Sequence, residues 1–263
     1  MPFVVAGGHR LEYTRIGAAG GDRGTLVLLH EGLGSIAMWR DFPERLAEAA
    51  RTSVVVYSRY GYGDSDALDA SRRVRYMHDE ALVTLPQFLD ALSIERPLLV
   101  GHSDGGSIAL IHAGGSGRTV AGVVAIAAHV IVEDISVASI AAARDAYRNT
   151  DLRSKLARYH ADVDGAFWGW NDIWLDPAFR AWNIEEYLPR IACPVLAIQG
   201  EDDEYGTMDQ LARIARGARD AELVRLDNCR HSPHRDRPDA LLAAIARFVE
   251  RVAVTWAAAT PES

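Results

Sequence analysis

Short runs of consecutive apolar residues recur along the chain, and between them apolar residues return at helical spacing on a more polar background. Continuous apolar runs are typical of strands covered on both faces, and their alternation with helices is typical of a mainly parallel sheet. The pattern therefore predicts an α/β fold in which a twisted sheet is flanked by helices. Strands are predicted at residues 26–29, 54–57, 98–100, 123–126, 195–198 and 223–226.

Other segments carry signals of their own. Residues 3–17 predict a hairpin, and a leucine stripe predicts a helix over residues 82–92, kinked at its proline. The final helix is predicted to be capped by Asp236 and to begin near Pro238. The tail after Trp256 is expected to fray.

Residues 133–190 break the alternation of strands and helices, because they carry helical patterns and no convincing strand. Four of the six tryptophans lie between Trp168 and Trp182. We therefore expect a helical cap of residues 133–190, inserted into a core domain formed by residues 1–132 and 191–263. A chain of 263 residues suits one large α/β domain with such an insertion.

Composition and charge narrow the classes of function. A formal net charge of -8 with scattered basic residues argues against a nucleic-acid surface. No signal peptide is visible in MPFVVAGGHR, and the longest apolar stretch, residues 120–132, is too short for a bilayer span of about 20 residues. Cys193 and Cys229 have no paired spacing that suggests a metal site. We expect a cytoplasmic protein with reduced thiols and a small-molecule partner, whose oligomeric state stays open.

One short motif points to chemistry. In GHSDGG, Gly101, Ser103 and Gly105 follow the apolar run 98–100 and precede a helical pattern. A G-x-S-x-G pattern between a strand and a helix is typical of a nucleophile elbow, in which a strained turn exposes the serine hydroxyl. Taken alone, the five residues are equally compatible with a tight structural turn.

A serine nucleophile requires a base, and the base requires an orienting group. The strand at residues 195–198 leads into the acidic stretch from Glu201 to Glu204, and the last strand leads to His231. The loops that follow parallel strands meet at one edge of a sheet, and the order serine, acid, histidine is the one expected for this arrangement. The sequence therefore predicts a triad of Ser103, an acid from this stretch and His231.

Together these motifs resemble the α/β-hydrolase fold family over nearly the whole chain, in particular esterase- and lactonase-like members with a serine nucleophile and a helical cap. The resemblance rests on the elbow, the late histidine and three further motifs: HEGLGS at residues 30–35, SRYGYGDS at residues 58–65 and GEDD at residues 200–203.

The resemblance refines the choice of triad residues. In this family the acid commonly lies three residues past the glycine that ends its strand, which favours Asp203 over Asp202. His231 fits the family histidine better than His234, although Arg230 stands where the family usually has glycine.

The resemblance also implies an oxyanion hole formed by two backbone N–H groups, those of Gly32 and Asp104. Glu31 stands where the family frequently has glycine. A carboxylate directed into the hole would oppose catalysis, so we expect the Glu31 side chain to point away, with substrate recognition as its alternative role.

Aromatic residues near the expected site are candidates for an apolar substrate pocket, although such residues more often pack a helical layer onto a core. The candidates are Trp39, His129, Trp168, Trp170 and Trp174.

The function expected from this resemblance is a cofactor-free, metal-free serine hydrolase that cleaves a small, fairly apolar carboxylic ester through an acyl-enzyme. Serine rather than aspartate at position 103 argues against a dehalogenase or an epoxide hydrolase. A lactonase, a thioesterase or a hydrolase of carbon–carbon bonds would use the same triad. A ligand receptor that does not turn over its ligand is the alternative from another class.

Overall fold

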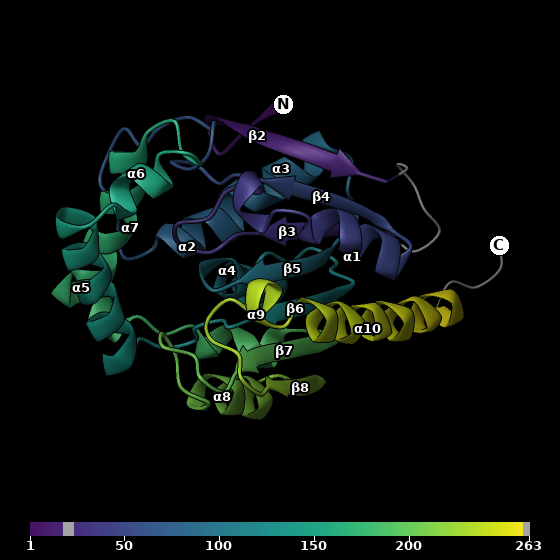
Figure 1. Cartoon of the computed structure of the whole chain (residues 1–263). Coiled ribbons are helices and arrows are strands. Elements are labelled where there is room, and N and C mark those ends of the chain that lie inside the picture. The colour runs from purple at the N-terminus through teal and green to yellow at the C-terminus, as the bar shows by residue number, and fades with distance from the viewer. Residues whose placement is uncertain (18–23, 260–263) are drawn as a thin grey trace.

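The computed structural model describes residues 1–17 and 24–259, with side chains up to residue 253. Within these residues one eight-stranded sheet has the order β1-β2-β4-β3-β5-β6-β7-β8 (Figure 1). Strand β2 is antiparallel to both neighbours, and the other neighbouring strands are parallel. The strands are β1 Phe3–Ala6, β2 His9–Ile16, β3 Thr25–Leu29, β4 Ser53–Tyr57, β5 Leu98–His102, β6 Gly122–Ile126, β7 Val195–Gly200 and β8 Ala221–Leu226.

Helices cover both faces of this sheet. Leu26 and Leu28 of β3 pack into a hydrophobic cluster with α1 (Phe42–Ala50) and α10 (Pro238–Ala259). Val27 and Leu29 of the same strand face the opposite cluster, because successive strand side chains alternate between faces. The helices of that face are α2 Tyr76–Asp79, α3 Leu85–Ala91, α4 Asp104–Gly115 and α8 Asp209–Gly217. The mainly parallel sheet flanked by helices is confirmed, and each predicted strand matches an observed one within two residues at either end.

Three local predictions differ in detail. The predicted kinked helix consists of a π-helical turn, η2 (Glu80–Thr84), followed by α3, with Pro86 in the first turn of α3. Asp236 ends the short helix α9 (Pro233–Asp236), and its carboxylate accepts a hydrogen bond from Arg230 N (2.9 Å). Helix α10 continues to Ala259, past the point at which fraying was expected, and the remaining tail residues 260–263 lie outside the described residues.

The segment after β6 is helical, as its pattern predicts. In Figure 1, α5 (Asp134–Asn149), α6 (Leu152–Leu156) and α7 (Val163–Leu175) lie together on the side of the molecule away from α10. Two 3-10 turns, η3 (Pro177–Ala181) and η4 (Glu185–Arg190), lead back to β7. Tyr147 of α5 stacks on Phe167 of α7 at 3.7 Å between ring centroids, so the two helices form one packed layer. Of the helices in the described ranges, none has the length and apolar character needed to cross a bilayer.

Candidate active site

Ser103 lies at a strained corner between β5 and α4. Its backbone has φ 52° and ψ -118°, and Ser103 N donates to Ile126 O at 2.8 Å. A positive φ is uncommon for a residue with a side chain and is found at tight functional turns. A Cβ atom at Gly101 would overlap Gly105 O, and one at Gly105 would overlap Leu29 O. Only glycine at both positions allows the strand, the helix and β3 to approach closely enough to form this corner.

His231 and Asp203 are joined by a hydrogen bond. His231 Nδ1 donates to Asp203 Oδ1 at 2.8 Å, and Asp203 Oδ1 also accepts from Tyr205 N at 2.8 Å. Gln199 Nε2 lies 3.2 Å from Asp203 Oδ2. Because Nδ1 carries the hydrogen that faces the carboxylate, Nε2 of a neutral His231 is free to accept a proton.

The carboxyl group of Asp203 is ionised at neutral pH. Burial alone would raise its pKa, but the hydrogen bond and charge of His231 and the N–H of Tyr205 outweigh it and hold the pKa below the usual value. The neighbouring Asp202 is exposed. Of the two carboxyl groups, only that of Asp203 bonds to His231.

The alternative histidine is buried elsewhere. The His234 ring lies 5.0 Å from Trp39 and 5.1 Å from His102, between centroids. Burial, reinforced by the charge of His102, lowers the pKa of His234 to about 3, so this imidazole is neutral. The His234 side chain is buried and also lies 6.1 Å from the Phe42 ring, between centroids.

A cavity of about 250 Å³ borders Ser103 and His231. Three of the five predicted pocket residues line it, namely His129, Trp170 and Trp174. Residues that were not predicted as pocket residues also line it: Leu33, His102, Ile140, Glu204, Tyr205 and Ser232. The Tyr205 ring is 4.7 Å from that of His231, and its position in the loop after the acid was the signal that could have revealed it.

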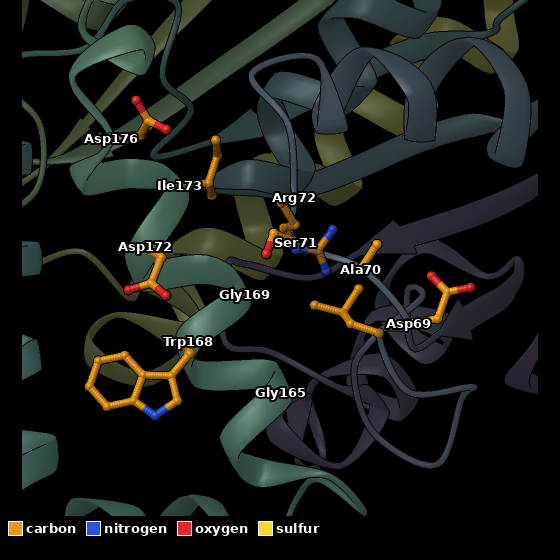
Figure 2. Close-up of a pocket in the computed structure, with 11 residues that line it drawn as sticks. Asp69, Ala70, Ser71, Arg72, Gly165, Trp168, Gly169, Asp172, Ile173 and Asp176 are labelled. Atoms are coloured by element: carbon orange, nitrogen blue, oxygen red, sulfur yellow. The ribbon is translucent and has the colours of Figure 1, made fainter.

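Trp39 and Trp168 do not line this cavity, which corrects their prediction as pocket residues. Trp39 is buried against Phe42, with 5.6 Å between the ring centroids. Trp168 borders a separate pocket of about 460 Å³ between α7 and the loop residues 68–72 (Figure 2). Residues two positions apart on a helix point in nearly opposite directions, so Trp168 cannot share the face of Trp170.

His129 is a neutral wall of the cavity. Its ring lies 5.1 Å from Trp174 and 5.9 Å from His231, between centroids. Burial, together with the charge of His231, lowers the pKa of His129 to about 4. The side chain therefore presents an uncharged edge to the cavity near pH 7.

Of the two residues predicted to supply N–H groups to an oxyanion hole, Asp104 follows Ser103 directly and Gly32 lines the same cavity as Ser103. Asp104 is the first residue of α4, where the first-turn N–H groups lack helical partners. Gly32 lines the cavity in a turn closed by Gly34 N and Glu31 O (3.1 Å). A Cβ atom at Gly32 would overlap the Trp170 indole, so this position has room only for glycine.

The Glu31 carboxylate faces His102. Its Oε2 atom is 3.4 Å from His102 Nδ1, and the side chain, 17% exposed, borders the cavity. Burial alone would raise the pKa of Glu31, but the hydrogen bond and charge of His102 hold it well below the usual value. His102 Nε2 in turn contacts His231 O at 2.7 Å. An ionised carboxylate therefore lies on the cavity wall, one residue before Gly32.

A buried polar network behind the elbow was not predicted. Tyr76 OH donates to Asp104 Oδ2 at 2.7 Å and accepts from Trp174 Nε1 at 3.0 Å. Arg59, only 1% exposed, places Nη2 3.6 Å from the same Asp104 oxygen. The sequence signal for this network was Arg59, a charged residue inside the turn-like motif SRYGYGDS.

The two cysteines are unreactive thiols. Cys193 and Cys229 are free cysteines, and burial raises their pKa values to about 11 and about 12. Both are therefore protonated thiols at neutral pH. Across residues 1–17 and 24–259, no group of three or more histidine, cysteine or acidic side chains is arranged to hold a metal ion.

The sheet order, the elbow after β5, and the aspartate and histidine after β7 and β8 define an α/β-hydrolase architecture. A sequence model described as the Alpha/beta hydrolase family matches residues 26–244. The chain belongs to this family.

Individual relatives are more distant. A proline iminopeptidase from Lactobacillus delbrueckii subsp. lactis is 30% identical over 112 residues, which cover 43% of this chain and 37% of the relative. The match thus spans little more than a third of that enzyme's length. The enol-lactonase from Burkholderia xenovorans LB400 has a TM-score of 0.75 at 21% identity, covering 95% of this chain and 100% of the other. The proline iminopeptidase of Mycobacterium smegmatis has a TM-score of 0.74 at 19% identity, covering 97% and 99%.

Proposed function

We propose that the protein is a serine hydrolase that cleaves a small, fairly apolar carboxylic ester without a cofactor. One observation carries the proposal: the hydrogen bond of 2.8 Å from His231 Nδ1 to Asp203 Oδ1 lies at the same cavity as Ser103. This is the arrangement that a serine hydroxyl, a poor nucleophile at neutral pH, requires for activation.

In the acylation step, His231 Nε2 takes the proton of Ser103 Oγ as the oxygen attacks the ester carbonyl carbon. The carbonyl oxygen becomes an anion that accepts hydrogen bonds from the N–H groups of Gly32 and Asp104. When the tetrahedral intermediate collapses, the bond to the alcohol oxygen breaks, and His231 gives that oxygen its proton. Asp203 holds the ring and stabilises its charged form.

In the deacylation step, water attacks the acyl carbon and transfers a proton to His231. The bond between the acyl carbon and Ser103 Oγ then breaks, the serine recovers its proton from His231, and the acid leaves. The ionised Asp203 supports the imidazolium in both halves of the reaction, because its lowered pKa keeps it a carboxylate near neutral pH.

The cavity wall supports the choice of substrate. Ile140 of α5 and Trp170 and Trp174 of α7 cover the serine from the helical segment, so residues 133–190 would act as a cap over the core of residues 1–132 and 191–263. A volume of about 250 Å³ and a largely apolar, aromatic lining suit a short acyl or aryl group.

Fluorophosphonate labelling and an ester panel test the proposal. The wild-type protein should be labelled at Ser103, as located by peptide mapping, and should turn over p-nitrophenyl acetate or butyrate. Ser103→Ala should lose both properties while its circular dichroism spectrum and melting temperature remain near those of the wild type. Activity retained by Ser103→Ala would overturn the triad, and labelling without turnover of esters, lactones or thioesters would favour a ligand receptor.

A second candidate is hydrolysis of an amide at an amino-terminal proline. The specific observation in its favour is the 30% identity over 112 residues with a proline iminopeptidase. Proline p-nitroanilide belongs in the panel for this reason. A higher kcat/KM for this amide than for the esters would make peptidase activity the primary function.

A further inference from the structure

The carbonyl group that precedes Gly32 has three hydrogen-bond partners: Gly34 N, which closes the turn at 3.1 Å, and two side chains. Arg59 Nη2 donates to Glu31 O at 2.9 Å, and His30 Nδ1 contacts the same oxygen at 2.7 Å. Glu31 O and Gly32 N belong to one planar trans peptide unit, in which C=O and N–H point in opposite directions. Donors that fix the carbonyl therefore also fix the direction of the Gly32 N–H.

Arg59 supports this carbonyl a second time through its own backbone. Arg59 N donates to His30 Nε2 at 2.9 Å, so that ring nitrogen must be the acceptor. The hydrogen of the neutral imidazole then lies on Nδ1, which donates to Glu31 O. Burial, with the charge of Arg59, lowers the pKa of His30 well below its usual value, so the ring stays neutral.

The same guanidinium faces the side chain of Asp104, the residue predicted to supply the second oxyanion donor. Its Nη2 atom is 3.6 Å from Asp104 Oδ2, and both side chains are 1% exposed. An uncompensated carboxylate on the residue whose N–H must bind an oxyanion would oppose the developing charge. Arginine keeps its charge when buried, so Arg59 offsets the Asp104 carboxylate.

We propose that Arg59 is a positioning residue of the oxyanion hole, which orients and polarises the Glu31–Gly32 peptide unit and neutralises the Asp104 side chain. The inference rests on the proposed serine-hydrolase function. Arg59 does not line the cavity and would act on the reaction only through the two backbone N–H donors.

Because the oxyanion exists only in the transition state and the tetrahedral intermediate, loss of Arg59 should lower kcat and leave KM nearly unchanged. Removal of a complete oxyanion donor lowers the rate by about 10²- to 10³-fold. In Arg59→Met the Gly32 N–H would be misaligned and the Asp104 carboxylate would be uncompensated. We therefore expect kcat to fall by about 10- to 100-fold in this variant.

Arg59→Lys is the second variant, because removing a buried cation can prevent folding. Lysine keeps a charge near Asp104 but lacks the rigid guanidinium whose Nη2 atom contacts both Glu31 O and Asp104 Oδ2, so an intermediate loss is expected. Arg72→Met is the matched control. Arg72 donates Nη2 to Tyr60 O at 2.9 Å and stacks over Tyr62 and Tyr76, yet it has no contact with the Glu31 carbonyl among its described bonds.

The inhibition constant of a trifluoromethyl ketone separates a role in the oxyanion hole from a merely structural role, because a merely structural role would leave this constant unchanged. Ser103 Oγ adds to the carbonyl carbon of the ketone, the serine proton passes to His231, and the former carbonyl oxygen becomes an anion in the hole. The inhibition constant of this ketone should rise in parallel with the loss of kcat in the Arg59 variants. The inhibition constant of the corresponding alcohol, which forms no oxyanion, should stay within about twofold.

The experiment begins with wild-type turnover of the p-nitrophenyl esters and labelling of Ser103; absence of both would refute the proposed function itself. Given an active wild type, the inference about Arg59 fails if folded Arg59→Met retains kcat within about threefold, or if the loss lies in KM. The inference also fails if the control Arg72→Met loses as much kcat as Arg59→Met. If Arg59→Met does not fold, Arg59→Lys decides: unchanged kcat and ketone affinity overturn the inference, and parallel losses support it.

Discussion

Asp203 Oδ1 lies 2.8 Å from His231 Nδ1 although the two residues follow different strands of the sheet. The register of β7 and β8 explains their meeting, because Gly200 pairs with Leu226 at the ends of the strands. Asp202 N then donates to Cys229 O at 3.0 Å, which joins the two loops just before they diverge. The aspartate–histidine contact is therefore a consequence of parallel pairing, and it needs no movement of either loop.

Asp203→Asn should lower kcat by about 10³- to 10⁴-fold with little change in KM. The amide nitrogen would favour a hydrogen on Nε2 of His231, so the imidazole could no longer take the proton of Ser103. Steady-state kinetics with a p-nitrophenyl ester measures the effect. The exposed Asp202 supplies the matched control, and Asp202→Asn should stay within about twofold of the wild type. Equal losses in both variants would contradict the assignment of Asp203.

Three buried histidines should make the folded protein sensitive to mild acid. Burial lowers the pKa to about 4 for His112, to about 4 for His129 and to about 3 for His234. In the unfolded chain each pKa returns to about 6.5. Below this pH the unfolded state binds more protons than the native state, so the free energy of unfolding falls as the pH falls towards 4. Each histidine contributes about 1.4 kcal/mol per pH unit at most.

Urea unfolding at pH 7 and pH 5 measures how the free energy of unfolding depends on pH. His112 allows a test at a residue that does not line the cavity at Ser103. Its Nδ1 atom bonds only to Ala81 O (2.7 Å) among the described residues, and its other ring nitrogen has no protein partner. His112→Gln should reduce the stability lost between pH 7 and pH 5 by about 2 kcal/mol and leave kcat unchanged. An unaltered pH dependence in this variant would mean that His112 titrates in the native state as it does in the unfolded chain.

The sequence predicted the sheet and the positions of the chemical groups well because both depend on local signals. Continuous apolar runs identified the strands, and glycines at positions 101 and 105 identified the elbow. Parallel strands present their carboxyl ends at one edge, so the loops with Ser103, Asp203 and His231 had to converge. Their catalytic roles stay predictions.

Other features depend on information that a linear pattern does not carry. Whether Trp168 or Trp170 faces the cavity depends on how α7 is rotated on the core, and the two candidates lie on nearly opposite sides of the helix. The contact between Arg59 and the Glu31 carbonyl joins loops after β4 and β3, and it depends on a buried Arg59 rotamer that lies over the Tyr62 ring. Neither arrangement follows from spacing along the chain.

Glu31→Gln should change which acyl groups the cavity accepts. The ionised carboxylate borders the cavity, so an acyl group with its own negative charge should be disfavoured relative to a neutral group of similar size. The ratio of kcat/KM for a succinate monoester to kcat/KM for a butyrate ester should rise about fivefold in the variant. Glu201→Gln, a change at an exposed loop residue, is the control and should leave the ratio unaltered. A ratio unchanged in Glu31→Gln would show that the Glu31 charge is screened from the substrate.

Gly32→Ala should lower kcat by about 100-fold, because the added methyl group would overlap the Trp170 indole and displace the peptide that carries the predicted oxyanion donor. The defect is steric, so it should be relieved by a smaller neighbour. The double variant Gly32→Ala, Trp170→Leu should regain at least about tenfold in kcat relative to Gly32→Ala, whereas Trp170→Leu alone should mainly raise KM by enlarging the pocket. Kinetics of the four proteins close a double-mutant cycle. Additive effects would mean that the two residues do not compete for space, and the loss at Gly32 would then require a change in the backbone itself.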